Sequence, residues 1–233
     1  MCVFTLLIAL LQAPPWVDSA RHQAQFVSVS EGVQLEVLDF GGSGRPIVLL
    51  AGLGNTAHVF DDFAPKLTSV GHVFAITRRG YGGSTQTESG YNVVRLGEDV
   101  LAVIDRVATG KPVLIGHSLG GQELSYLAST HTERIAAVIY LEAAHRYAYD
   151  VPGEFERDLP NLPAPPSTPP PAPAVAGVVL PEAEQRQSRG RPGAAQAILA
   201  GSLQFTKIDV PALAIFASPH DVATGDFRGS TRR

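Results

Sequence analysis

Cysteine is nearly absent from this chain: only Cys2 among the 233 residues carries a thiol. A single thiol excludes a disulfide framework and a cysteine-based metal site. Basic runs are absent too, and the formal net charge is −4, so nothing in the charge pattern favours a nucleic-acid partner. What remains is the composition of a globular protein, 45% hydrophobic and 17% charged, long enough for one α/β domain with a sizeable core.

The N-terminal apolar run, Val3–Leu11, is too short to span a bilayer. Because Ser19 and Ala20 follow at a distance typical of a cleavage site, we predict a signal peptide over residues 1–20, a secreted or periplasmic location and no stable membrane anchor. No Lys or Arg precedes the run and Asp18 is unfavourable near the cleavage site. The alternatives are a misassigned start or a helix packed on the domain, with a cytoplasmic location.

The most informative stretch is Pro112–Gly121, in which four apolar residues lead into Gly-His-Ser-Leu-Gly and a helix-compatible segment, Gln122–Ser129, follows. This is the G-x-S-x-G pattern in a strand–turn–helix setting. A serine on a sharp turn needs neighbours without side chains, which Gly116 and Gly120 provide. The pattern predicts that Ser118 is an exposed nucleophile at the N-terminus of a helix.

Periodicity predicts the other elements around this turn. We expect a hairpin over 25–39, helices over 56–67 and 91–108, and buried strands over 46–50, 72–77, 135–141 and 210–217. Ten prolines between Pro152 and Pro181 are incompatible with a helix or a central strand and indicate an insertion. The predicted organisation is a core over 25–143, a proline-rich cap or lid over 144–206, a core strand and acid loop over 207–221, and an unstructured tail over 222–233.

This order of elements resembles the α/β-hydrolase superfamily, which implies a mostly parallel sheet flanked by helices. The resemblance implies Ser118 as nucleophile and the backbone N–H groups of Leu53 and Leu119 as the oxyanion hole. The family usually has His before Gly52, where this chain has Ala51; the replacement matters little because the donor is main chain. The loop Arg79–Ser84 matches a family loop that braces the site. His117, beside the nucleophile, is expected to point away from the pocket.

For the triad acid, the resemblance leaves two candidates. Asp221 follows the 212–217 strand, where most members carry this acid, and Glu142 ends the preceding strand, a position that some haloalkane dehalogenases use. We favour Asp221. Those dehalogenases use an Asp nucleophile, so the analogy to Glu142 is partial.

The resemblance also implies a final strand, a catalytic histidine and a closing helix after the acid, yet Val222–Arg233 contains no histidine. His58, His145 and His220 are weak substitutes. We expect a chain truncated before the last strand, which leaves the 212–217 strand as an exposed sheet edge. A shortened ligand-binding protein and an unrecognised base are the alternatives.

The resulting hypothesis is a serine hydrolase that cleaves an ester or related acyl bond in a small molecule without metal or cofactor, disabled by the missing histidine. A non-catalytic binding protein with the same pocket is the second hypothesis. Oligomeric state and substrate identity are not encoded in any pattern of the chain.

Overall fold

The computed structural model describes residues 21–143, 197 and 204–215. The predicted signal peptide, most of the proline-rich cap, the acid Asp221 and the C-terminal tail lie outside these residues and stay predictions.

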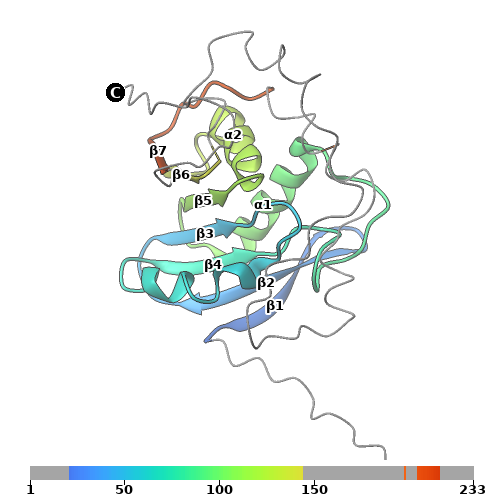
Figure 1. The fold of residues 1–233 in the computed structure, drawn as a ribbon, viewed down its shortest axis with the longest axis horizontal. Helices are drawn as coiled ribbons and strands as arrows, with labels where there is room; N and C mark the ends of the chain where they lie inside the picture. The colour runs from blue at the N-terminus through green and yellow to red at the C-terminus, as the bar shows by residue number, and fades with distance from the viewer. Residues whose placement is uncertain (1–20, 144–196, 198–203, 216–233) are drawn as a thin grey trace, which may run out of the picture.

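A seven-stranded sheet in the order β1-β2-β4-β3-β5-β6-β7 forms the centre of the fold (Figure 1). Its first two strands form the expected antiparallel hairpin, and β2 also runs antiparallel to β4. The remaining neighbours pair in parallel, which confirms the mostly parallel sheet. The strands are β1 (Gln23–Ser30), β2 (Val33–Gly41), β3 (Pro46–Leu50), β4 (His72–Ile76), β5 (Val113–His117), β6 (Ala137–Leu141) and β7 (Ala212–Ile215).

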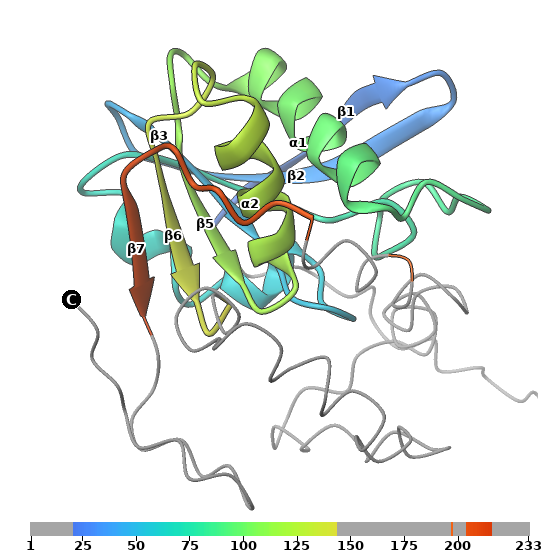
Figure 2. The same ribbon diagram turned by 90° about the horizontal axis from the view of Figure 1, so that it is seen from above.

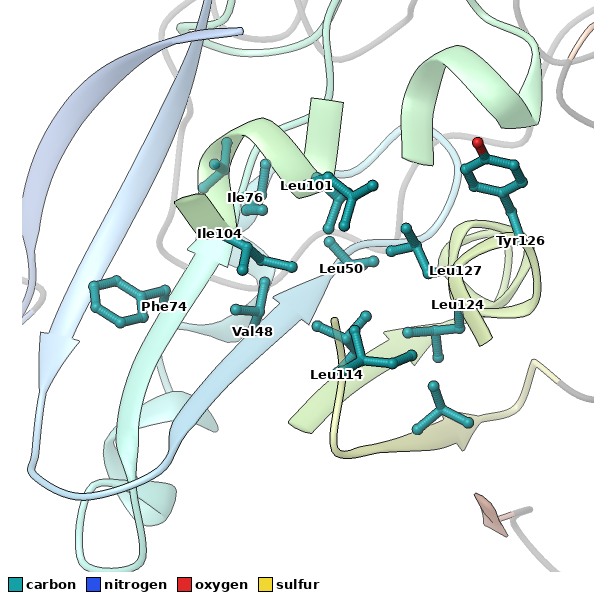
Figure 3. Packing of buried hydrophobic residues seen from close by; sticks show 14 of the residues in the cluster. Val48, Leu50, Phe74, Ile76, Leu101, Ile104, Leu114, Leu124, Tyr126 and Leu127 are labelled. Atoms are coloured by element: carbon teal, nitrogen blue, oxygen red, sulfur yellow. The ribbon is translucent and has the colours of Figure 1, made fainter. Parts of the chain in front are cut away.

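Two hydrophobic clusters cover the two faces of the sheet. Successive side chains of a strand point to opposite faces, so β3 sends Val48 and Leu50 into one cluster and Ile47 and Leu49 into the other. The larger cluster lies between the sheet and the helices α1 (Val93–Val107) and α2 (Gly120–Thr130), as Figure 3 shows for the labelled residues. Figure 2 shows the two helices beside the sheet. β3 is therefore buried on both faces, which explains its uninterrupted apolar sequence.

The second face carries two short 3₁₀ helices, η1 (Ala57–Phe60) and η2 (Ala64–Leu67), where the sequence predicted one helix over 56–67. That prediction is wrong, and Pro65 gives the physical reason. Its nitrogen cannot donate to the carbonyl of Asp61, and its ring would clash with that carbonyl in a continuous α-helix. The chain begins a new turn at Ala64 instead, with Pro65 in its first turn.

The strand predicted over 210–217 is present as β7, but the prediction that it is buried is wrong. β7 pairs with β6 as expected, but all four of its residues are exposed, with Leu213 at 52% and Ile215 at 48%. β7 is the edge of the sheet within the described residues, which agrees with the expected exposed edge. The preceding segment packs on α2 through Phe205, whose ring centroid is 5.0 Å from that of Tyr126. Among the described helices, none combines the length and the hydropathy needed to cross a membrane.

Candidate active site

Ser118 lies at the turn between β5 and α2, in the strained conformation that the glycine pattern predicts. Its φ is +48°, a region that residues with a Cβ rarely adopt, and the residue is exposed. Two hydrogen bonds hold the turn: Ser118 N–H donates to the Leu141 carbonyl of β6 at 3.0 Å, and the Gly121 N–H donates to the Ser118 carbonyl at 3.0 Å. The surrounding structure therefore holds Ser118, the serine of the G-x-S-x-G pattern, in a strained backbone conformation.

Close packing accounts for the glycines beside this turn. A Cβ on Gly116 would lie 2.8 Å from both the Gly120 carbonyl carbon and Leu124 Cδ1. A Cβ on Gly120 would lie 2.6 Å from the Leu50 carbonyl oxygen at the end of β3. Because real Cβ atoms do not approach other atoms so closely, the turn can pack against β3 and α2 only with glycine at both positions.

The loop after β3 passes directly beside Ser118. A Cβ on Gly52 would lie 3.3 Å from Ser118 Cβ and 3.0 Å from His117 Nδ1. Within the described part of the chain, the N–H groups of Leu53 and Leu119 donate no hydrogen bond to another residue. Both predicted oxyanion donors thus belong to segments that meet at Ser118, and neither N–H group donates to another of the described residues. Leu119 also stands at the N-terminus of α2, where the helix dipole favours negative charge.

A buried ion pair, which sequence analysis did not identify, ties this loop to the helix that follows the nucleophile. Arg78 Nε donates to Glu123 Oε1 at 2.5 Å, and its second nitrogen donates to Oε2 at 2.8 Å. Arg78 also donates to the Ala51 carbonyl at 2.8 Å and to the Gly52 carbonyl at 3.4 Å. Both charged residues are almost fully buried, at 6% and 2% exposed. Arg78 therefore joins the loop after β3, which carries the predicted donor Leu53 and is called the oxyanion loop below, to α2 through four hydrogen bonds.

Electrostatics favour the charged state of this pair. Burial opposes the charge on Arg78, but the Glu123 carboxylate outweighs it and raises the pKa of Arg78 above its ordinary value. A cavity of ≈ 10 Å³, which has room for about one water molecule, adjoins the pair. Ser118 is not among the residues that line it, so this cavity is not a substrate pocket.

The loop Arg79–Ser84 is held by a second set of buried contacts. Arg79 makes two hydrogen bonds to Asp99 of α1, at 2.5 and 2.6 Å, and Arg95 binds the same carboxylate at 2.6 Å. Ser84 Oγ accepts from the Glu36 N–H at 2.9 Å and donates to the Thr77 carbonyl at 2.6 Å. These contacts connect the loop to β2, to the residue that follows β4 and to α1.

Of the two candidate acids, the structure describes only Glu142. It follows β6 directly, and its N–H donates to the Ile215 carbonyl of β7 at 2.9 Å. Its φ of +50° makes it, with Ser118, one of two non-glycine residues in the left-handed region within the described ranges. The carbonyl of Leu141, the residue before it, accepts a hydrogen bond from the Ser118 N–H, so Glu142 lies at the same edge of the sheet as Ser118. Asp221 lies outside the described residues, so both candidates remain.

No histidine forms a hydrogen bond with Ser118 Oγ in the part of the chain that the structure describes. His72 and His131 lie beside the carboxylates of Asp39 and Glu98. His58 Nδ1 is hydrogen-bonded to Asp61 at 3.2 Å and its Nε2 lies 3.8 Å from Glu36, and these two carboxylates raise the pKa of His58 to about 10. A histidine protonated at neutral pH cannot accept the serine proton, so the structure argues against His58 as the base. His145 and His220 lie outside the described residues.

Comparisons with known proteins identify the class to which this fold and site belong. A family profile described as "alpha/beta hydrolase fold" matches residues 45–191, which is more than half of the chain. The chain therefore belongs to the α/β-hydrolase family.

Individual relatives share part of their length with this chain. Epoxide hydrolase A of Mycobacterium tuberculosis is 35% identical over 116 residues, which cover 48% of this chain and 36% of that protein. A non-heme haloperoxidase of Rhodococcus erythropolis is 32% identical over 120 residues, 51% of this chain and 43% of the relative. The chain thus spans less than half the length of these two curated relatives.

Among solved structures, a bromoperoxidase from Bacillus anthracis aligns with 55% of this chain and 48% of its own, at a TM-score of 0.50 and 26% identity. A hydrolase from Pseudomonas aeruginosa covers 83% of this chain and 80% of its own, at a TM-score of 0.60. At 24% identity the second likeness concerns the fold alone.

Proposed function

We propose that this chain is a serine hydrolase that cleaves an ester or related acyl bond of a small molecule, with Ser118 as nucleophile. The observation that carries the proposal is the φ of +48° at Ser118, a strained backbone between β5 and α2 that exposes the side chain beside the loop after β3. Ser118 Oγ attacks the carbonyl carbon, and the oxyanion formed on the carbonyl oxygen accepts hydrogen bonds from the Leu53 and Leu119 N–H groups. The acyl group transfers to Ser118 as the leaving group departs with a proton, and water then releases the acid.

A relative supports this reaction class. The pyrethroid hydrolase of Sphingobium wenxiniae is 31% identical over 124 residues, which cover 49% of this chain and 44% of that protein. The name of the epoxide hydrolase of Mycobacterium tuberculosis indicates a different reaction for that protein, and the family performs such chemistry through an aspartate nucleophile. Because this chain carries Ser118 at the elbow, acyl transfer is the reaction that its own residues favour.

The role of the acid falls to Asp221 or Glu142, which would orient a histidine that accepts the serine proton. The absence of a histidine at Ser118 among the described residues favours a second function, the binding of an ester-like ligand without turnover. Loss of a triad member in a serine hydrolase costs about 10⁶-fold in kcat, while the oxyanion hole and binding retain about 10³-fold over water. The two functions therefore differ by several orders of magnitude in the reactivity of one hydroxyl.

The test is the intact mass of the purified chain after exposure to a fluorophosphonate, which modifies activated serines. The matched control is Ser118→Ala, which keeps the backbone conformation and removes only the hydroxyl. A single adduct on the natural chain and none on the variant would support the hydrolase. No adduct on a folded chain would refute it, and a melting-temperature shift with a non-hydrolysable ester analogue would then support ligand binding.

A further inference from the structure

Two histidines and one aspartate, from two segments of the chain, lie close together. His22 immediately precedes β1, whereas His58 lies in η1 and Asp61 directly follows it. Asp61 Oδ1 is 3.3 Å from His22 Nδ1, and Asp61 Oδ2 is 3.2 Å from His58 Nδ1. The possible ligand atoms of the three side chains all lie within 4.8 Å of one another. Imidazole and carboxylate together form the donor set that divalent transition metals prefer.

The separations fit a tetrahedral ion. Zinc binds imidazole nitrogen and carboxylate oxygen at about 2.0–2.2 Å, so neighbouring ligand atoms of a tetrahedral site lie about 3.4 Å apart. The two nitrogen–oxygen separations, 3.3 and 3.2 Å, are already close to this value. These two separations involve different oxygens of Asp61, and one ligand atom from each of the three side chains lies within 4.8 Å of the other two, so side-chain rotation must close the widest of these gaps for all three groups to bind one ion.

A buried oxygen within the cluster gives an independent reason to consider a cation. Asp61 Oδ1 is buried and accepts no hydrogen bond from the residues that the structure describes, although His22 Nδ1 is near. The contact between them has the length of a hydrogen bond without its alignment. An unsatisfied buried carboxylate oxygen is costly, and a bound cation would satisfy it.

Glu36 lies on the far side of the His58 ring, at ion-pair rather than hydrogen-bond distance. Its Oε1 is 3.8 Å from His58 Nε2, on the ring nitrogen that does not face Asp61. Its Oε2 accepts a hydrogen bond from Thr77 Oγ1 at 2.7 Å, which fixes the carboxylate. A carboxylate on the second nitrogen orients the ring and makes the first nitrogen a better ligand.

We propose that His22, His58 and Asp61 bind a divalent transition-metal ion, Zn²⁺ foremost, with water completing the coordination and Glu36 orienting His58. The ion would tie the residue before β1 to the turn that follows the oxyanion loop, as a structural site separate from the chemistry at Ser118. Sequence analysis expected no metal, because the two histidines are far apart in the chain and show no ligand spacing. Metal ligands must be deprotonated, so binding is measured at about pH 8 rather than in acid.

The experiment is a calorimetric titration of the tag-free chain, freed of metal with a chelator, with ZnCl₂. We expect one Zn²⁺ per chain, and no stoichiometric binding in Asp61→Asn or His58→Ala. Glu36→Gln is expected to bind about 10- to 100-fold more weakly. The matched control is His131→Ala, because His131 also lies beside a carboxylate, Glu98 at 3.3 Å, yet belongs to another part of the surface. It is expected to bind like the natural chain.

Two results would overturn the proposal: no stoichiometric binding to the natural chain, or unchanged affinity in the Asp61 and His58 variants. Loss of binding in the His131 variant would overturn it as well. If a variant fails to fold, as judged by circular dichroism, the zinc X-ray absorption spectrum of the natural chain decides. It is expected to contain two imidazole ligands, and a spectrum without imidazole scattering would refute the site. None of these measurements depends on activity at Ser118.

Discussion

Removing Glu123 is expected to leave Arg78 as an unpaired charge in the core. Arg78 is 6% exposed and Glu123 2%, so bulk water has little access to the charge that is left behind. Breaking a buried ion pair by removing one partner costs about 3–5 kcal/mol, whereas a whole domain is stable by about 5–15 kcal/mol. We expect Glu123→Ala to lower the free energy of unfolding by about 3–5 kcal/mol. Glu123→Gln keeps the shape and one acceptor, and is expected to lose about 1.5–3 kcal/mol.

The measurement is urea unfolding followed by far-UV circular dichroism, with the slope against urea concentration compared between variants. Glu133→Ala is the matched control, because Glu133 is exposed and its loss should change stability by no more than about 0.5 kcal/mol. High salt is expected to leave the difference between the two variants intact, since buried charges are screened little. If Glu123→Ala is as stable as Glu133→Ala, the ion pair does not support the core and the reasoning fails.

The pair also predicts an effect at the site. Arg78 holds the carbonyls of Ala51 and Gly52, so losing its partner should loosen the loop that carries the Leu53 N–H. We expect Glu123→Gln to slow fluorophosphonate labelling of Ser118 while the chain stays folded. Equal labelling rates would indicate that the oxyanion loop keeps its position without the ion pair.

Three further predictions concern single backbone and packing features. We expect Ser118→Gly to be about 1 kcal/mol more stable than Ser118→Ala, because only glycine removes the Cβ that strains a φ of +48°. The measurement is thermal unfolding of both variants, and equal or lower stability of the glycine variant would contradict this strain. Gly97→Ala places a Cβ 2.1 Å from Tyr126 Cδ1, which should cost about 1–3 kcal/mol in overpacking and gain about 1 kcal/mol in helix propensity. We therefore expect a lower melting temperature. A raised melting temperature would show that α1 and α2 are not packed so closely. The Asn92 side chain caps α1 by accepting a hydrogen bond from the Arg95 N–H at 2.9 Å. We expect Asn92→Ala to lower the free energy of unfolding in urea by about 1 kcal/mol, and Asn92→Asp to lower it much less. Equal losses of stability in the two variants would exclude the cap.

Local sequence patterns determined most of the elements that position the site. Uninterrupted apolar runs predicted β3 and β4 because parallel strands are buried on both faces. Gly116 and Gly120 predicted the strained turn because close backbone approach requires residues without a Cβ. The helix over 56–67 failed for a local reason as well, since Pro65 interrupts the hydrogen-bond ladder that the hydrophobic periodicity suggested.

Only the tertiary structure decided which charges are buried and which side chains meet. Nothing in the spacing of Arg78 and Glu123 distinguishes them from surface charges; they pair because β4 and α2 converge behind the oxyanion loop. The same holds for His22 and His58, which the hairpin and η1 bring together around Asp61. The apolar sequence of β7 is that of a buried strand, yet its exposure depends on which elements lie beside it in space. Hydrophobic periodicity indicates the surroundings of one segment. The buried ion pair, the histidine cluster and the exposure of β7 depend on residues that are distant in the sequence, and only the folded chain brings those residues together.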